Sequence, residues 1–166
     1  MTFFIRRLIH VIGKRMPPPD RWEVYRPMGS VIPGTKFVAF KVPLKEELLK
    51  EVKEKDKFSP AILMKLLGDQ GLKLGGIIDL TFTYKYYDSE EFLKNAVEYK
   101  KIFTPGHDVP SESVFQQFAH AVKKFDAGDN DHIIGVHCTH GVNRTGYLIC
   151  RYMIEEMNFE PDVAIS

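Results

Sequence analysis

The chain has 166 residues, which suggests one domain large enough to bury a hydrophobic core without disulfides or metals. Its 44% hydrophobic and 27% charged residues are typical of a globular protein, and the formal net charge of +1 gives no indication of a nucleic-acid-binding protein. Its two cysteines, Cys138 and Cys150, are too few for a disulfide framework, so we expect reduced thiols in an intracellular, soluble protein.

Residues 1–17 form a lead-in that mixes cations with apolar side chains and precedes the first acid, Asp20. We expect it to be loosely ordered and to end at the prolines 17–19, since no small-residue cleavage site is evident. The alternative is a targeting or membrane-surface segment. No apolar run approaches the roughly 20 residues that span a bilayer, so we expect no membrane partner. Residues 18–166 are then expected to form the folded domain.

The first elements after the lead-in follow local sequence patterns. Residues 36–42 are β-branched and aromatic, which predicts a strand. Residues 45–57 are highly charged and are expected to be a solvated helix face or a loop. Ser59 and Pro60 suit the N-cap and first position of a helix that runs to about Leu67.

Strand and helix patterns alternate in the middle of the chain. Residues 76–80 are a short apolar run that contains an acid, which predicts a buried strand, and residues 99–103 predict another. Ser111 begins a helix with apolar residues on one side. That apolar side consists of Val114, Phe118, Val122 and Phe125.

The last part of the chain repeats the alternation. Residues 133–137 predict a strand, residues 145–157 a helix, and Pro161 the first position of a further helix. Because strands alternate with helices, we expect an α/β domain with a twisted, mostly parallel central sheet flanked by helices.

The segment HCTHGVNRT, which begins at His137, joins the predicted strand 133–137 to the predicted helix 145–157. Backbone amides and the positive end of the helix meet there, which favours an anion site. Gly141 lets the backbone approach a ligand closely, and the Arg144 guanidinium matches the oxygens of a phosphate in pairs. The same positive charge favours the thiolate of Cys138.

A thiolate beneath a bound phosphate is placed for in-line attack on phosphorus. Cys138 would form a phosphocysteine that water then hydrolyses, and the Thr145 hydroxyl would stabilise the departing thiolate. We expect His137 to hold the loop through a backbone bond and not to act as a base. The expected substrate-binding residues are Thr139, His140, Gly141, Val142, Asn143 and Arg144.

Two other interpretations of this segment are open. Cys138 can be a structural cysteine in a strand-to-helix turn, or His137, Cys138, His140 and Cys150 can be metal ligands. Adjacent residues on a strand point to opposite faces, and no second Cys/His pair is present, so we expect no metal. Cys150 is expected to be a packed thiol and not a disulfide partner of Cys138.

His-Cys, five residues and then Arg-Thr is the signature of the cysteine-dependent protein tyrosine phosphatase superfamily. The longer string HCTHGVNRTGYLICRY resembles RNA 5'-phosphatases of the dual-specificity type, which include the triphosphatase domain of metazoan mRNA capping enzymes. The resemblance covers nearly everything from about Pro18 onward. Further matching stretches are DRWEVYRPMGSVIPGTKFVAFKVPL from Asp20, GGIIDLTFTYKYYD from Gly75 and YKKIFTPGHDVP from Tyr99.

The resemblance implies a cysteine-phosphatase fold and makes residues 18–166 a catalytic domain. It implies removal of the γ and then the β phosphate from tri- or diphosphorylated RNA 5' ends, without a metal or other cofactor. By the same resemblance, RNP or splicing-associated proteins are expected partners and the nucleus the location, and we expect a monomer. The family continues beyond a position equivalent to Ser166 into a further helix, so the C-terminal helices are expected to be truncated.

Two carboxylates are candidates for supporting roles. A phenolate leaving group, with a pKa of about 10, needs a proton donor, whereas a phosphate, with a second pKa of roughly 6, leaves with little protonation. Asp108 is the candidate general acid, with a plain turn residue as the alternative. Asp79 is expected to orient Arg144 or the loop, or to bond a neighbouring amide.

The segment that follows the predicted strand 76–80 contains three candidates for contacts with RNA. Lys85 is a candidate contact for the outer phosphates, while Tyr86 and Tyr87 either stack on a base or pack in the core.

The predicted activity is that of an RNA 5'-tri/diphosphatase working through a Cys138 phosphocysteine. The alternatives are a dual-specificity protein phosphatase for phosphotyrosine or phosphothreonine, and a non-catalytic phosphate- or RNA-binding module. A lipid phosphatase of this superfamily would carry lysines in the loop, and THGVN has none.

Overall fold

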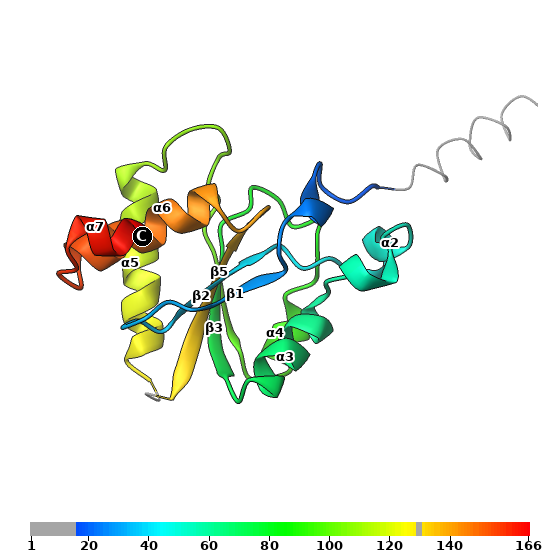
Figure 1. Cartoon of the computed structure of the whole chain (residues 1–166), viewed down its shortest axis with the longest axis horizontal. Coiled ribbons are helices and arrows are strands. Elements are labelled where there is room, and N and C mark those ends of the chain that lie inside the picture. Colours follow the sequence, from blue (N-terminus) through cyan, green and yellow to red (C-terminus); the bar gives the residue numbers. More distant parts are fainter. Residues whose placement is uncertain (1–15, 129–130) are drawn as a thin grey trace, which may run out of the picture.

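The computed structural model describes residues 16–128 and 131–166, so the expectations for residues 1–15 lie outside it. A five-stranded sheet in the order β1-β2-β5-β3-β4 forms the centre, with helices on both faces (Figure 1). The strands are β1 (Met28–Val31), β2 (Phe37–Lys41), β3 (Lys73–Asp79), β4 (Glu98–Lys101) and β5 (His132–Cys138). All neighbouring strands are parallel except β1 and β2, which confirms the mostly parallel α/β prediction.

The helical elements divide between the two faces of the sheet (Figure 1). On one face lie α5 (Glu112–Asp126), α6 (Asn143–Glu155) and α7 (Pro161–Ile165). On the other face lie the short helix α2 (Glu46–Leu49), then α3 (Pro60–Asp69) and α4 (Glu90–Leu93). Two single 3-10 turns, η1 (Trp22–Val24) and η2 (Glu54–Asp56), complete the described elements.

Two of the longer helices, α3 and α5, begin as their sequences predict. The Ser59 hydroxyl accepts a hydrogen bond from the Ile62 amide at 3.2 Å and caps α3, and Ser111 caps α5 through the Val114 amide at 3.3 Å. The predicted apolar side of α5 packs on the sheet, with Phe118 fully buried and Phe125 partly buried.

Several boundaries differ from the prediction. β1 was not predicted, because MGSV has no apolar alternation and is held as an edge strand by its antiparallel pairing with β2. Within the charged stretch 45–57, Leu48 and Leu49 are buried, so α2 packs on the core instead of lying entirely in solvent. α6 begins at Asn143, two residues before the predicted start.

Residues 20–26, which we call the N-terminal strap, precede β1 and pack against the ends of β2 and β5. Trp22 is completely buried, and its Nε1 donates to the Val42 carbonyl at 2.8 Å. The buried Lys41 ammonium lies 3.7 Å from the centre of the indole ring and donates to the carbonyls of Trp22 and Tyr25. Because Lys41 pairs with Cys138 in the sheet, these contacts fix the strap beside the loop that follows Cys138.

Within the part of the chain that the structure describes, no helix is both long enough and apolar enough to cross a membrane.

Candidate active site

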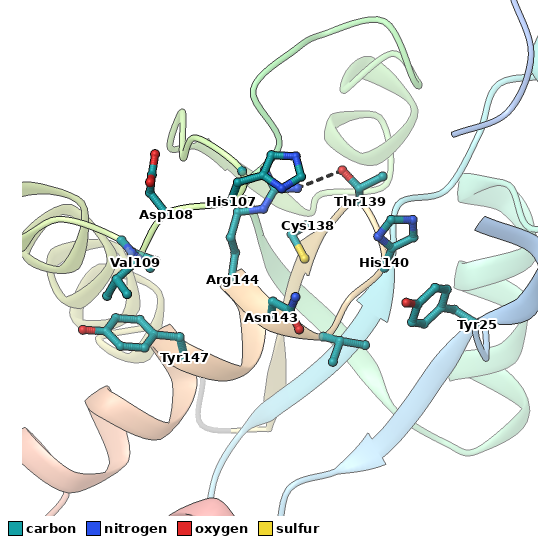
Figure 2. Close-up of a pocket in the computed structure, with 13 residues that line it drawn as sticks. Tyr25, His107, Asp108, Val109, Cys138, Thr139, His140, Asn143, Arg144 and Tyr147 are labelled. Atoms are coloured by element: carbon teal, nitrogen blue, oxygen red, sulfur yellow. Dashed lines mark hydrogen bonds between the residues drawn. The ribbon is translucent and has the colours of Figure 1, made fainter. Parts of the chain in front are cut away.

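The loop between Cys138 and Arg144 connects the end of β5 to the start of α6 (Figure 2). Gly141 has a φ of +75°, and a Cβ atom there would lie 2.5 Å from the backbone carbonyl of Phe40. Neither the backbone conformation nor the space admits a side chain. The glycine therefore lets the loop turn tightly against β2, so that the residues around it line a pocket.

A pocket of about 520 Å³ opens over the loop (Figure 2). Cys138 lies at its base with only 3% of its surface exposed. The pocket is lined by Tyr25, Gly106, His107, Asp108, Val109, Pro110, Cys138, Thr139, His140, Val142, Asn143, Arg144 and Tyr147. The predicted substrate-binding residues thus come together there, except that Gly141 shapes the loop from behind.

Backbone carbonyls hold the Arg144 guanidinium. Nη1 donates to the carbonyl oxygens of Thr104 at 2.9 Å and Leu80 at 3.3 Å. Nη2 donates to the Thr139 hydroxyl at 2.9 Å (Figure 2). The guanidinium is therefore fixed at the pocket between the segments that follow β3 and β4, where its charge faces an incoming anion.

The electrostatics of the loop favour the Cys138 thiolate. Burial alone would raise the pKa of Cys138, but the hydroxyl and amide of Thr145, the Arg144 charge and the Gly141 amide together lower it. Among the described residues, the buried Thr145 hydroxyl has no partner with ordinary hydrogen-bond geometry, so it remains available to the sulfur. These groups stabilise a negative charge at the base of the pocket.

His137 lies behind the loop and not in the pocket. Its Nδ1 is 3.2 Å from the Cys138 carbonyl, which is the expected backbone contact, and its Nε2 is 2.7 Å from the Tyr87 hydroxyl. Complete burial lowers the pKa of His137, although the neighbouring Asp79 carboxylate acts in the opposite direction. The ring therefore braces the end of β5 from inside the core.

Asp79 is the centre of a buried polar cluster. Its carboxylate accepts hydrogen bonds from the Thr81 amide at 2.8 Å, from the Tyr99 hydroxyl at 2.7 Å and from the Lys101 ammonium at 3.0 Å. Burial alone would raise the pKa of Asp79, but His137, Lys101 and these hydrogen bonds lower it. The bond to a neighbouring amide is present at Thr81. The Arg144 guanidinium instead donates to the carbonyls of Leu80 and Thr104, and a role of Asp79 in orienting Arg144 or the loop stays a prediction.

Asp108 lies on the exposed loop that forms one wall of the pocket. Its carboxylate points away from the Cys138 sulfur (Figure 2). The preceding residue, His107, has a φ of +70°, and the backbone bends at residues 106–108. This geometry fits the interpretation of Asp108 as a turn residue. Asp108 could act as a general acid only if the loop moved its carboxylate toward Cys138.

The pocket also includes residues that the sequence did not predict. Tyr25 of the N-terminal strap stacks on the His140 ring, with the centroids 4.6 Å apart, and His140 Nε2 lies 2.8 Å from the Asp20 carbonyl. Tyr147 of α6 and His107 complete the rim. No local pattern indicates the contact between His140 and Asp20, since these two residues are 120 positions apart.

The tyrosines after β3 have separate environments. Tyr87 is buried, which confirms core packing for that ring, and Tyr86 is half-buried with the Lys85 ammonium 5.2 Å from its centroid. The described residues that line the pocket do not include Lys85, Tyr86 or Tyr87.

Cys150 is a half-buried free thiol that donates to the Ala164 carbonyl at 3.0 Å, as expected for a packed cysteine. Among residues 16–128 and 131–166, no three His, Cys, Asp or Glu side chains are grouped so that they could hold a metal ion.

The sequence profile of the dual specificity phosphatase catalytic domain matches residues 59–166. The chain is 50% identical over 150 residues to the human RNA/RNP complex-1-interacting phosphatase, covering 89% of this chain and 45% of that protein. It is 44% identical over 159 residues to a Caenorhabditis elegans homolog of that phosphatase, covering 93% and 67% of the two chains. A tyrosine-protein phosphatase of Autographa californica nuclear polyhedrosis virus is 43% identical over 149 residues, covering 89% and 86%. The chain thus spans about half the length of its mammalian relatives.

Solved phosphatase structures share the fold at low sequence identity. Tk-PTP in its active form has a TM-score of 0.60 and 14% identity, covering 84% of this chain and 80% of that one. PTPMT1 has a TM-score of 0.55 and 21% identity, covering 78% and 73%.

Proposed function

The chain belongs to the dual-specificity phosphatase family and is a cysteine-dependent phosphatase, and on that premise we propose that it is an RNA 5'-tri/diphosphatase. The observation that carries the chemistry is the Cys138 thiol at the base of a pocket that also presents Arg144 and the loop. The RNA substrate is supported by 50% identity to a phosphatase whose name refers to an RNA/RNP complex.

In the proposed reaction the Cys138 thiolate attacks the γ phosphorus. The S–P bond forms as the bond from phosphorus to the bridging oxygen breaks, and RNA with a 5' diphosphate leaves. Arg144 and the loop amides hold the equatorial oxygens of the phosphoryl group while negative charge moves from the sulfur to the leaving oxygen. Water then attacks the phosphocysteine, the S–P bond breaks, and inorganic phosphate and the thiolate are released. The Thr145 hydroxyl stabilises that thiolate, and the β phosphate can follow by the same steps.

The position of Asp108 is consistent with a leaving group that needs no proton donor. A diphosphate end is a weak base and departs with little protonation, whereas a phenolate or alkoxide needs a proton donor. The Asp108 carboxylate is turned away from Cys138 (Figure 2), as expected for a site that does not depend on it.

The remaining parts of the proposal come from the relatives. We propose tri- and diphosphorylated RNA 5' ends as substrates, RNP proteins as partners and the nucleus as location, with no metal required. The mammalian relatives, whose names refer to RNA/RNP complex-1, support the first two.

The second candidate is a dual-specificity protein phosphatase. The viral relative, 43% identical, is named a tyrosine-protein phosphatase, which favours phosphotyrosine as the alternative substrate. A purely phosphate- or RNA-binding module would not need the thiol, so Cys138→Ser would leave its function intact.

Phosphate release from a short 5'-triphosphate RNA in EDTA, beside release from a phosphotyrosine peptide, tests the proposal. We expect faster release from the RNA, and none with Cys138→Ser. Preference for the peptide would assign the site to protein substrates, and release that requires added Mg²⁺ would overturn the metal-free mechanism.

Asp108→Asn separates the two substrates through their leaving groups. We expect release from triphosphate RNA to change less than about threefold, against the roughly 10²-fold or greater loss typical when a needed general acid is removed. The measurement is kcat/KM on both substrates. A loss of that size on RNA would contradict the proposed leaving-group chemistry.

A further inference from the structure

Three aromatic side chains form an exposed patch beyond the ends of β3 and β4, and the chemistry at Cys138 does not use them. Phe82, Tyr84 and Phe103 are 62%, 65% and 45% exposed. The Phe103 ring meets both others edge to face, with centroids 5.6 Å from Phe82 and 5.2 Å from Tyr84. We call these residues the aromatic patch. Grouped, exposed rings of this kind indicate a binding surface.

The aromatic patch rests on a fixed support. The Lys101 ammonium donates to the Thr81 hydroxyl and to the Thr83 carbonyl, each at 2.6 Å, and so ties down the turn that carries Phe82 and Tyr84. The same ammonium lies 5.0 Å from the Tyr84 centroid and 5.3 Å from the Phe103 centroid. Asp79 fixes Lys101 in turn. The rings are therefore arranged before any ligand binds, which lowers the entropy cost of binding.

The aromatic patch is close in the sequence to the carbonyl groups that hold Arg144 at the pocket. Arg144 donates to the carbonyls of Leu80 and Thr104. Phe82 follows Leu80 by two residues, and Phe103 directly precedes Thr104. The aromatic patch therefore includes residues within two positions, along the chain, of both carbonyl groups that hold Arg144.

The chemistry of the surface favours an unpaired nucleic-acid strand. Stacking on aromatic rings suits every base, and a cation beside the rings suits the backbone. The exposed Lys85, next to Tyr84 in the sequence and with its ammonium 5.2 Å from the centre of the Tyr86 ring, is a candidate for such a cation. We propose that the aromatic patch stacks the unpaired bases that follow the 5' phosphates of the RNA, an inference that rests on the proposed function for the link between the two sites.

The test measures binding separately from catalysis. A 3'-fluorescein hexanucleotide with a 5' hydroxyl is titrated with the full chain, with the double variant Phe82→Ala/Tyr84→Ala and with Val163→Ala. Val163 is 57% exposed on α7 and serves as the control for loss of surface area. We expect Kd to rise about tenfold or more in the double variant, as for loss of base stacking, and to stay unchanged in the control.

Two single variants separate stacking from general apolar contact. Tyr84→Phe keeps a ring and should bind as the wild type does, whereas Tyr84→Leu keeps apolar area without a ring and should weaken binding. Equal binding by Tyr84→Leu and the wild type, or by the double variant and the wild type, would overturn the inference. Equal binding by the double variant and the wild type would instead favour a protein partner as the ligand of the aromatic patch.

Phosphate release from 5'-triphosphate RNA distinguishes the two failures. If the wild type releases phosphate and the double variant has an unchanged KM, the aromatic patch is not a subsite, and the proposed function stands. If the wild type releases none while the hexanucleotide still binds through the rings, the proposed function fails, and stacking at the patch is supported alone.

Discussion

The Thr145 hydroxyl is the group whose removal should act most directly on the Cys138 thiolate. It lowers the pKa of Cys138, although burial of the thiol acts in the opposite direction. The proposed mechanism requires the thiolate, so we expect activity above the pKa of Cys138 and its loss as the pH falls below that value. The hydroxyl thereby extends activity toward lower pH.

We expect Thr145→Val to move the acid limb of the kcat/KM profile to higher pH. We also expect kcat to fall about tenfold or more, the cost of a hydrogen bond to a charged group. The measurement is phosphate release from a small aryl phosphate across the pH range. Thr145→Ser retains the hydroxyl and is the control, and an acid limb that Thr145→Val leaves in place would contradict this role.

We expect Asp79 to contribute to the stability of the fold more than to the chemistry at Cys138. It is a buried carboxylate with its partner Lys101 at 3.0 Å, and its pKa is lowered on folding. A lowered pKa stabilises the fold fully above the ordinary value of 3.8, and this contribution is lost as the pH falls through the lowered value. The folded protein therefore loses stability in strong acid.

We expect Asp79→Asn to lower the free energy of unfolding by about 3–5 kcal/mol at pH 7, because Lys101 would stay buried without its charge partner. The measurement is urea unfolding at several pH values, and the part of the acid dependence due to Asp79 should disappear in the variant. Asp69→Asn, which breaks the exposed pair with Lys65, should cost less than about 1 kcal/mol. Equal losses in the two variants would contradict the role given to burial.

At the scale of elements, the loop between Cys138 and Arg144 packs closely against β2 because Gly141 has no side chain. Gly141 presses on the Phe40 backbone at a positive φ, so any Cβ would push the loop away from the sheet. Gly146 lies inside α6, and a Cβ atom there would meet nothing within 4 Å beyond the backbone of its own helix. Two glycines five residues apart thus have opposite tolerances.

We expect Gly141→Ala to abolish most phosphate release and to lower the melting temperature, because backbone must shift to make room. Gly146→Ala should stabilise the helix by about 1 kcal/mol, since alanine is the better helix former. Thermal unfolding and phosphate release of both variants provide the comparison. Full activity in Gly141→Ala would show that the loop does not depend on this contact.

Local patterns predicted the elements whose residues carry their own signal. The N-caps Ser59 and Ser111 and the apolar run of β5 were identified because each reports on its immediate neighbours. β1 was missed because its pairing with β2 is a tertiary contact that MGSV does not encode. Local propensity is silent wherever a strand depends on its partner.

The candidate site shows the same division. The loop from Cys138 to Arg144 was predicted because its residue types and spacing are contiguous. The carbonyls of Leu80 and Thr104 that hold Arg144 were missed, because every residue has a carbonyl and only the tertiary structure determines which of them point at Arg144.

At the scale of the whole molecule, the N-terminal strap ties a segment outside the matched residues 59–166 to the active site. Trp22 fills the core on the face of the sheet opposite α5, and it positions Tyr25 at the pocket. Folding of the domain and completion of the pocket therefore depend on the same residue.

We expect Trp22→Ala to lower the free energy of unfolding by about 3–5 kcal/mol, as for truncation of a buried aromatic ring. Where the variant remains folded, KM should rise more than kcat falls, because the strap touches the pocket and not the sulfur. Val24→Ala, at a strap residue 73% exposed, is the control and should change neither quantity. A KM unchanged in a folded Trp22→Ala protein would remove the strap from substrate binding.

The depth of Cys138 has a consequence for which phosphates the enzyme meets. Only 3% of this residue reaches solvent, at the base of a walled pocket. In the proposed RNA substrate, a phosphate between two nucleotides is flanked on both sides, whereas one at the 5' end is flanked on one side only and fits a deep pocket more readily. If RNA is the substrate, as proposed, we expect the pocket to admit 5'-terminal phosphates and to exclude internal ones by steric hindrance, without any contact to the bases.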